Sequence, residues 1–195
     1  MNAKPCGLIS CIPPALQKEW AQNLALFARR FRPAALILKQ PAQDVLERIL
    51  EKARPIELAI LVTDSIATAC NSGASGVYFP VYGGNVKKAR DELGSSAVIG
   101  AFCGLSRHAA MECAEAGADF IAFDATRAEA LDTCADLSFW WDEVTGIPVA
   151  LALGTLRPNA SVLSKARPDF LLAEETDCAG ESLTFATEFG LQSQI

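Results

Sequence analysis

A chain of 195 residues with 51% hydrophobic and 21% charged residues can fill one large core, which excludes an intrinsically disordered protein. Its 17 Lys and Arg against 23 Asp and Glu give a formal net charge of -6, which argues against nucleic acid or an anionic membrane as a partner. Seven cysteines without a Cys-x-x-Cys pair and a single His, His108, argue against a zinc site.

The cysteines also indicate a compartment. Free Cys side chains behave as small hydrophobic groups and disulfides are rare in the cytoplasm, so we expect reduced, mostly buried thiols in a cytoplasmic protein. No apolar run is long enough for a transmembrane helix. Pro13-Pro14 and a charged segment follow the short apolar stretch near the N-terminus, so we expect no signal peptide.

Short apolar runs alternate with amphipathic segments along the chain. The apolar runs predict strands at residues 7–12, 34–39, 57–62, 77–80, 98–101, 120–123, 148–153 and 170–173. The other segments predict helices at residues 14–30, 45–53, 65–70, 86–93, 106–117, 127–144 and 158–165, and residues 183–189 close the set.

The clearest unit runs from residue 98 to residue 123. Ser106 is placed to cap a helix at its N-terminus, and Gly117 stands where a left-handed residue ends a helix. One face of that helix carries Leu105, Ala109, Cys113 and Ala116. The two flanking strands are then parallel neighbours joined by a right-handed crossover.

Eight strand–helix repeats at a spacing of roughly 20 to 25 residues predict an α/β fold with a parallel sheet. Eight such units close as a (β/α)8 TIM barrel, here a compact single domain over residues 1–195. The alternative is an open doubly wound sheet. No Gly-x-Gly-x-x-Gly segment follows the first strand and no phosphate-loop motif is present, so we predict the barrel.

In a barrel, functional residues lie at the carboxyl ends of the strands. Lys39 and Asp64 are the predicted catalytic residues at these ends. The predicted substrate-binding residues are Tyr78, Phe102, Cys103, Asp124, Gly154, Thr155 and Glu175.

Two of these residues have alternative interpretations. Lys39 ends an apolar strand, so it is either a desolvated amine for Schiff-base or phosphate chemistry or a lysine that extends from the rim into solvent. Asp64 either holds Mg²⁺ or caps the third helix, and we favour the cap. Cys103 has no His placed by the sequence to activate it, so we expect no nucleophilic role.

Three stretches of the chain resemble the thiamine phosphate synthase superfamily, which includes thiazole tautomerase-like barrels. They are Ile99-Gly100 with Glu115-Ala116-Gly117-Ala118-Asp119-Phe120-Ile121, Ser72-Gly73-Ala74-Ser75-Gly76-Val77-Tyr78, and Gly146-Ile147-Pro148-Val149 with Gly154. The resemblance implies a TIM-barrel transferase of thiamine biosynthesis that joins a pyrimidine diphosphate to a thiazole phosphate, uses Mg²⁺ and releases diphosphate. It also implies that Asp64 is a metal ligand and that Lys39 lies near the family's basic pair on the second strand.

Other positions depart from the family's pattern. Tyr78 replaces a His, Phe102 and Gly104 replace a Ser and a His or Thr, Asp124-Ala125 replaces Gly-Pro, Leu153-Gly154 replaces two glycines, and Glu174 or Glu175 replaces a small hydroxyl residue. A carboxylate about 4 Å from a phosphate oxygen costs about 4 kcal/mol at an effective dielectric near 20. We therefore predict a thiamine phosphate synthase-like protein whose catalytic motifs are largely degraded, which argues against ordinary activity.

Other functions stay open. One is a non-catalytic or altered-ligand barrel without a cofactor that binds a small molecule or a protein partner, and the acidic residues Glu174, Glu175 and Asp177 favour it. Another is a Schiff-base lyase that uses Lys39. Thiazole-isomerising relatives are a further alternative, although their His after the fifth strand is missing here. We expect a small-molecule ligand, and a homodimer is one possible assembly.

Overall fold

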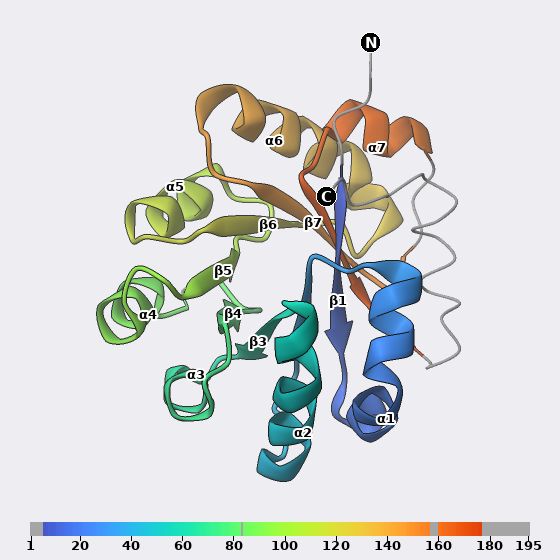
Figure 1. Ribbon diagram of the computed structural model, residues 1–195. Coiled ribbons are helices and arrows are strands. Elements are labelled where there is room, and N and C mark those ends of the chain that lie inside the picture. Colours follow the sequence, from blue (N-terminus) through green and yellow to red (C-terminus); the bar gives the residue numbers. More distant parts are fainter. Residues whose placement is uncertain (1–5, 83, 157–159, 177–195) are drawn as a thin grey trace.

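Eight parallel strands form a closed barrel in the computed structural model, which describes residues 6–82, 84–156 and 160–176 (Figure 1). The strands are β1 (Gly7–Ile12), β2 (Ala35–Leu38), β3 (Ala59–Thr63), β4 (Gly76–Phe79), β5 (Val98–Phe102), β6 (Phe120–Asp124), β7 (Val149–Gly154) and β8 (Phe170–Glu174). Each strand pairs with the next in sequence, and β8 pairs back with β1, where Cys11 lies opposite Glu174. The predicted TIM barrel is confirmed.

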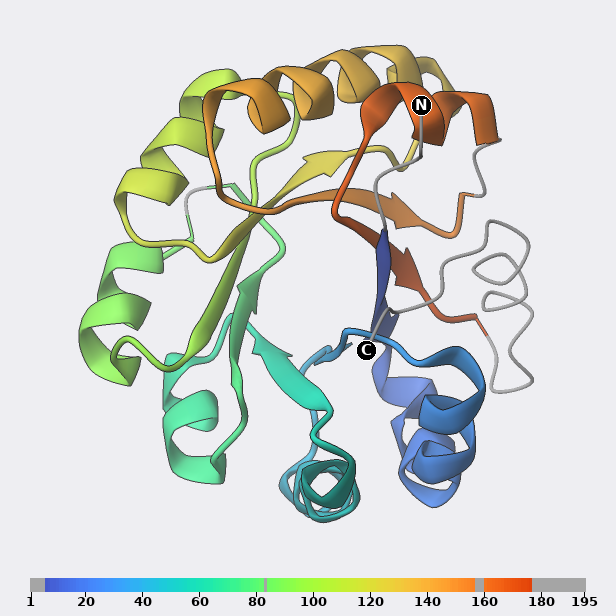
Figure 2. The same cartoon turned by 45° about the horizontal axis from the view of Figure 1, so that its top comes forward.

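Helices surround the barrel on its outside, as the turned view shows (Figure 2). The described helices are α1 (Pro14–Phe31), α2 (Gln43–Ala53), α3 (Ile66–Ser72), α4 (Val86–Leu93), α5 (Arg107–Glu115), α6 (Leu131–Val144) and α7 (Ala160–Ala166). None of these described helices combines the length and the apolar character that a membrane span needs. The predicted segment at residues 183–189 lies outside the described residues.

The unit around α5 agrees with its prediction in detail. The Ser106 hydroxyl accepts a hydrogen bond from the Ala109 N–H at 3.2 Å, and so caps the helix. Gly117 has φ 98°, the left-handed conformation that glycine adopts most easily. Both ends of α5 are therefore fixed by local residues.

The third strand begins later than its apolar run predicts. A 3-10 turn, η1 (Arg54–Ile56), extends α2, and Glu57 follows it with φ 53°. The Leu58 N–H then donates to the Ala53 carbonyl at 3.2 Å. Residues 57 and 58 form the connection from the helix to the strand, so β3 spans 59–63 rather than 57–62.

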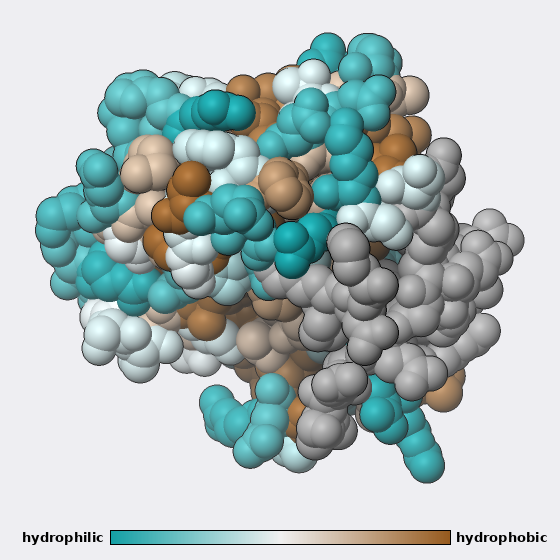
Figure 3. Space-filling model, turned by 90° about the horizontal axis from the view of Figure 1, so that it is seen from above, coloured by the Kyte–Doolittle hydropathy of each residue, from teal (hydrophilic) through white to brown (hydrophobic). Residues whose placement is uncertain are grey.

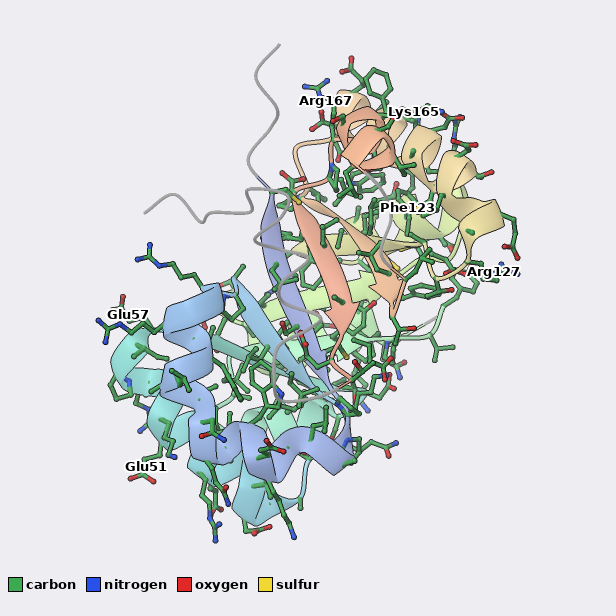
Figure 4. All side chains as sticks on the ribbon, turned by 90° about the vertical axis from the view of Figure 1, so that its right-hand side faces the viewer. Glu51, Glu57, Phe123, Arg127, Lys165 and Arg167 are labelled. Carbon is green, nitrogen blue, oxygen red and sulfur yellow. The ribbon has the colours of Figure 1, made fainter. Side chains whose placement is uncertain are left out.

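The core has two layers because successive strand side chains point to opposite faces. The outer layer lies between strands and helices and includes Phe123, which is labelled in Figure 4. Phe123 packs edge-on against Trp141 with ring centroids 6.4 Å apart. The inner layer fills the barrel around Phe120. A Cβ on Gly100 would lie 2.1 Å from Phe120 Cζ, so glycine is needed at position 100 to admit this ring.

Seen from above, the described part of the surface carries mainly hydrophilic side chains with small, separate hydrophobic groups between them (Figure 3).

Candidate functional site

The carboxyl ends of the strands meet at one end of the barrel, which we call the mouth. Strand alternation identifies the side chains directed toward the barrel axis there, because they continue the register of the inner core layer. These mouth positions are Cys11, Lys39, Thr63, Tyr78, Phe102, Asp124, Gly154 and Glu174.

Lys39 forms an ion pair with Glu174 across the top of β1. Lys39 Nζ lies 2.9 Å from Glu174 Oε2, and the two side chains are 36% and 34% exposed. The amine is therefore neither free for a carbonyl or phosphate nor extended alone into solvent. Neither interpretation of Lys39 from the sequence included this partner.

Cys11 lies beneath this ion pair, opposite Glu174 in the strand register. Burial, with smaller contributions from Glu174 and Glu175 and against the opposing effect of Lys39, raises the pKa of the Cys11 thiol to about 12. The thiol is therefore neutral at physiological pH. It forms part of the apolar floor of the mouth rather than a nucleophile.

Gln17 on α1 fixes the ends of β1 and β2. Its side-chain amide is buried and donates to the Ile12 carbonyl at 3.1 Å and to the Lys39 carbonyl at 2.7 Å. The sequence analysis missed this residue. The available signal was a polar residue on the buried stripe of α1, in helical register with Trp20 and Leu24.

Replacing Gln17 with Leu is expected to lower the free energy of unfolding by about 2 kcal/mol, because two carbonyl groups lose a buried donor. Urea unfolding followed by circular dichroism measures this change. Gln22→Leu, on the exposed side of the same helix, is the control and is expected to change stability by less than about 0.5 kcal/mol. Equal effects of the two substitutions would contradict the role given to Gln17.

Asp64 follows β3 with φ 53° and an exposed side chain. Its N–H donates to the Tyr78 carbonyl at 3.1 Å, which ties the turn to β4. The favoured prediction that Asp64 caps α3 is wrong: Ser65 is the cap, and its hydroxyl accepts from the Thr68 N–H at 3.1 Å. Partial burial raises the pKa of the Asp64 carboxyl above its usual value.

Tyr78 and Phe102 give the mouth an aromatic lining. Tyr78 is buried and stacks on Phe120 with ring centroids 6.0 Å apart. Burial raises the pKa of its phenol, as do Cys11, Cys103, Asp64 and Asp124, so the hydroxyl stays protonated. Phe102 is half-buried against the inner core layer.

Asp124 and Gly154 are joined through the loop after β6. Asp124 Oδ1 accepts from the Thr126 N–H at 3.1 Å and from its hydroxyl at 2.7 Å. Arg127 Nη2 lies 3.9 Å from Asp124 Oδ2, and its side chain extends outward (Figure 4). Gly154 has φ 55°, and a Cβ there would touch Thr126 Cγ2 at 3.4 Å. The structure thus brings these two predicted residues together, with the exposed Thr155 next to them.

Cys103 and Glu175 are each one residue out of phase with a mouth position, Phe102 and Glu174 respectively. Cys103, predicted to bind substrate, faces the helix layer because it is one residue out of phase with the inward-facing Phe102. Glu175 is 1% exposed and follows the inward-facing Glu174. Its N–H donates to the Cys11 carbonyl at 3.0 Å, which extends the pairing of β8 with β1.

Sequence comparison finds similar proteins over most of the chain, although no family model matches it. The chain is 32% identical to a thiamine-phosphate synthase from Rhodospirillum centenum over 178 residues, which cover 85% of this chain and 86% of that protein. It is 37% identical to one from Erythrobacter litoralis over 144 residues, 70% of this chain and 67% of that protein.

Structure comparison supports the barrel. A thiamine phosphate pyrophosphorylase from Pyrococcus furiosus superposes with a TM-score of 0.71 at 18% identity, over 97% of this chain and 94% of the other. A mutant tryptophan synthase α-subunit from the same organism gives 0.66 at 15% identity, over 98% and 94%. At these identities the likeness shows the fold alone.

Proposed function

The chain belongs to the thiamine-phosphate synthase family, and from this premise we propose that its barrel mouth joins a pyrimidine diphosphate to a thiazole phosphate and releases diphosphate. The observation that carries the proposal is Asp64. Its carboxylate is exposed at the end of β3, and no hydrogen bond or ion pair joins it to another residue in the described ranges. A metal-bound diphosphate can therefore approach it.

Mg²⁺ fits this donor set only together with the substrate. No three His, Cys, Asp or Glu side chains among the described residues gather closely enough to hold a metal ion by themselves. Mg²⁺ is usually held by one or two carboxylates plus substrate phosphates, and Asp64 would be the carboxylate. The ion, when bound, neutralises charge on the leaving diphosphate.

The other mouth residues bind and orient the two rings in this proposal. In the transfer, the bond from the pyrimidine carbon to the diphosphate oxygen breaks, diphosphate leaves with the electron pair, and an electron pair of the thiazole forms the new bond. Tyr78 keeps its proton and can donate a hydrogen bond, while Phe102 offers an apolar surface for a planar ring. Asp124 is held in one orientation by Thr126, as positioning a substrate requires.

Diphosphate release that requires both substrates and Mg²⁺ tests the proposal. We expect release with the pyrimidine diphosphate and the thiazole phosphate together, and none above background when the thiazole phosphate is omitted. Release that is independent of the thiazole phosphate would show hydrolysis instead of transfer.

The ion pair at Lys39 favours a second candidate, a barrel whose ligand carries no diphosphate. Lys39 is already neutralised by Glu174 at 2.9 Å, so this corner offers an incoming diphosphate little net positive charge. A neutral or cationic ring compound would meet no such obstacle, since the remaining mouth positions include the aromatic Tyr78 and Phe102 and the acidic Asp124.

Replacing Glu174 with Gln is expected to tighten binding of inorganic diphosphate by about tenfold or more, because it removes a negative charge and frees the Lys39 ammonium. Isothermal titration with Mg²⁺ present measures the affinity. Glu143→Gln removes a carboxylate that lies 3.8 Å from Arg167 on the helix layer, and it is expected to leave the affinity unchanged. An unchanged affinity in Glu174→Gln would contradict the obstructing role of Glu174.

The proposed transferase would act on small molecules in the cytoplasm. The thiols of Cys11, Cys103, Cys113 and Cys134 are free and buried, which suits a reducing compartment.

A further inference from the structure

Two cysteine thiols meet behind the mouth, between β5 and α5. Cys103 follows the last residue of β5 and is 1% exposed, and Cys113 lies on the buried side of α5 and is 8% exposed. A hydrogen bond between the two side chains raises the pKa of Cys103 and lowers that of Cys113, whereas burial and Glu112 act against that lowering. The Ala101 carbonyl, 3.6 Å from Cys103 Sγ, is a second acceptor for the same proton. The two thiols are therefore close enough to interact, and both belong to the same buried cluster.

Cys113 lines a surface opening, whereas Cys103 is 1% exposed. Cys113 forms part of a groove of about 680 Å³ that runs between α4 and α5, together with Tyr82, Val86 and Glu112. The Tyr82 hydroxyl donates to Glu112 Oε2 at 3.1 Å, which joins the loop before α4 to α5 along the groove. A small uncharged reagent can reach Cys113 by this groove, while Cys103 lies behind it.

We propose that Cys113 and Cys103 form an oxidation-sensitive modification site, in which Cys113 reacts with a small peroxide that enters the groove and Cys103 then closes a reversible intrachain disulfide. The proposal does not depend on the transferase activity.

The chemistry balances with hydrogen peroxide as the oxidant. The Cys113 thiolate attacks one peroxide oxygen, the O–O bond breaks, and the leaving hydroxide takes a proton to form water, which leaves a sulfenic acid on Cys113. The Cys103 sulfur then attacks the Cys113 sulfur and displaces the hydroxyl group as a second water. Two thiols lose two electrons in total, and one peroxide is reduced to two water molecules.

The disulfide would form next to backbone that shapes the mouth. The Cys103 N–H donates to the Ala122 carbonyl at 2.9 Å, and the Asp124 N–H donates to the Gly104 carbonyl at 2.9 Å. The linked cysteine therefore belongs to the turn that holds the end of β6 in place.

Peptide mapping after peroxide treatment tests the pair directly. Trypsin cleaves after Arg107, so Cys103 and Cys113 fall in separate peptides, residues 91–107 and 108–127. The full chain carrying Cys70→Ser, which removes an exposed thiol, is treated with a few equivalents of hydrogen peroxide, alkylated and digested without reductant. We expect the two peptides joined, 2 Da lighter than their sum, separated again by dithiothreitol, and formed about tenfold faster than oxidation of the buried Cys134.

Single substitutions assign the two roles. In Cys103→Ala, Cys113 is expected to stop as a sulfenic acid that dimedone traps, and in Cys113→Ser the Cys103 thiol is expected to remain reduced. Absence of the joined peptides, or a dimedone adduct on Cys103 in place of Cys113, would overturn the proposal. Because the joined peptides are measured with both thiols in place, this result stands even where a variant does not fold.

Discussion

Replacing Asp64 with Asn is expected to lower thiamine phosphate formation by about a hundredfold or more, with no loss of thermal stability. The amide keeps the shape of the side chain but loses the charge that would hold Mg²⁺ against the diphosphate, and several kcal/mol of charge stabilisation correspond to at least this factor. Stability is preserved because the raised pKa of the Asp64 carboxyl means that folding disfavours its ionised form. The protonated Asp64 carboxyl can stabilise the fold only below its raised pKa, and this contribution is lost as the pH rises through that pKa. At neutral pH the substitution therefore removes no stabilising contribution of the carboxyl.

Glu51→Gln is the matched control, because Glu51 is an exposed carboxylate on α2, far out on the helix layer in Figure 4. Steady-state rates at a series of Mg²⁺ concentrations, together with a melting temperature for each variant, measure both effects. A drop in melting temperature that parallels the loss of activity would point to a structural role for Asp64 instead.

Replacing Gly76 with Ala is expected to destabilise the fold by about 3 kcal/mol or more. A Cβ at this position would lie 1.8 Å from the Val98 carbonyl oxygen, which belongs to the neighbouring strand β5. Backbone atoms cannot move aside without separating β4 from β5, so the overpacking cost falls at the upper end of its usual range. A decrease of roughly 6 °C or more in melting temperature follows for a chain of this length.

Gly146→Ala is the control for this substitution, because a Cβ at Gly146 would meet no atom within 4 Å. Its melting temperature is expected to stay within about 2 °C of the unsubstituted protein. A Gly76→Ala protein as stable as this control would show that β4 and β5 do not lie at the described register.

The barrel could be predicted because each of its signals is local. Apolar runs at regular spacing mark buried parallel strands, and Ser106 and Gly117 mark the two ends of α5 through their own side chain or backbone freedom. The start of β3 could not be predicted in this way. Pro55 and the left-handed Glu57 extend α2 into a turn, and an apolar run alone does not show where such a turn ends.

The candidate site was predictable as a set of strand ends but not as a set of contacts. The strand-end rule placed Tyr78, Asp124 and Gly154 at the mouth, as the structure does, but it did not consider side-chain alternation, which turns Cys103 toward the helices. The ion pair between Lys39 and Glu174 joins residues that are far apart in sequence, and only the closure of β8 on β1 brings them together. Pairings made by barrel closure leave no local pattern in the sequence.

A single-turnover reaction with the protein in excess tests the transferase proposal most directly. With the pyrimidine diphosphate, the thiazole phosphate and Mg²⁺ present, we expect thiamine phosphate and diphosphate to appear in equal amounts, up to one equivalent of the limiting substrate. Both products should disappear when a chelator removes Mg²⁺. If no thiamine phosphate forms while the protein remains folded, the mouth does not perform the transfer. The second candidate, a barrel that binds a ligand without a diphosphate, is then the better explanation.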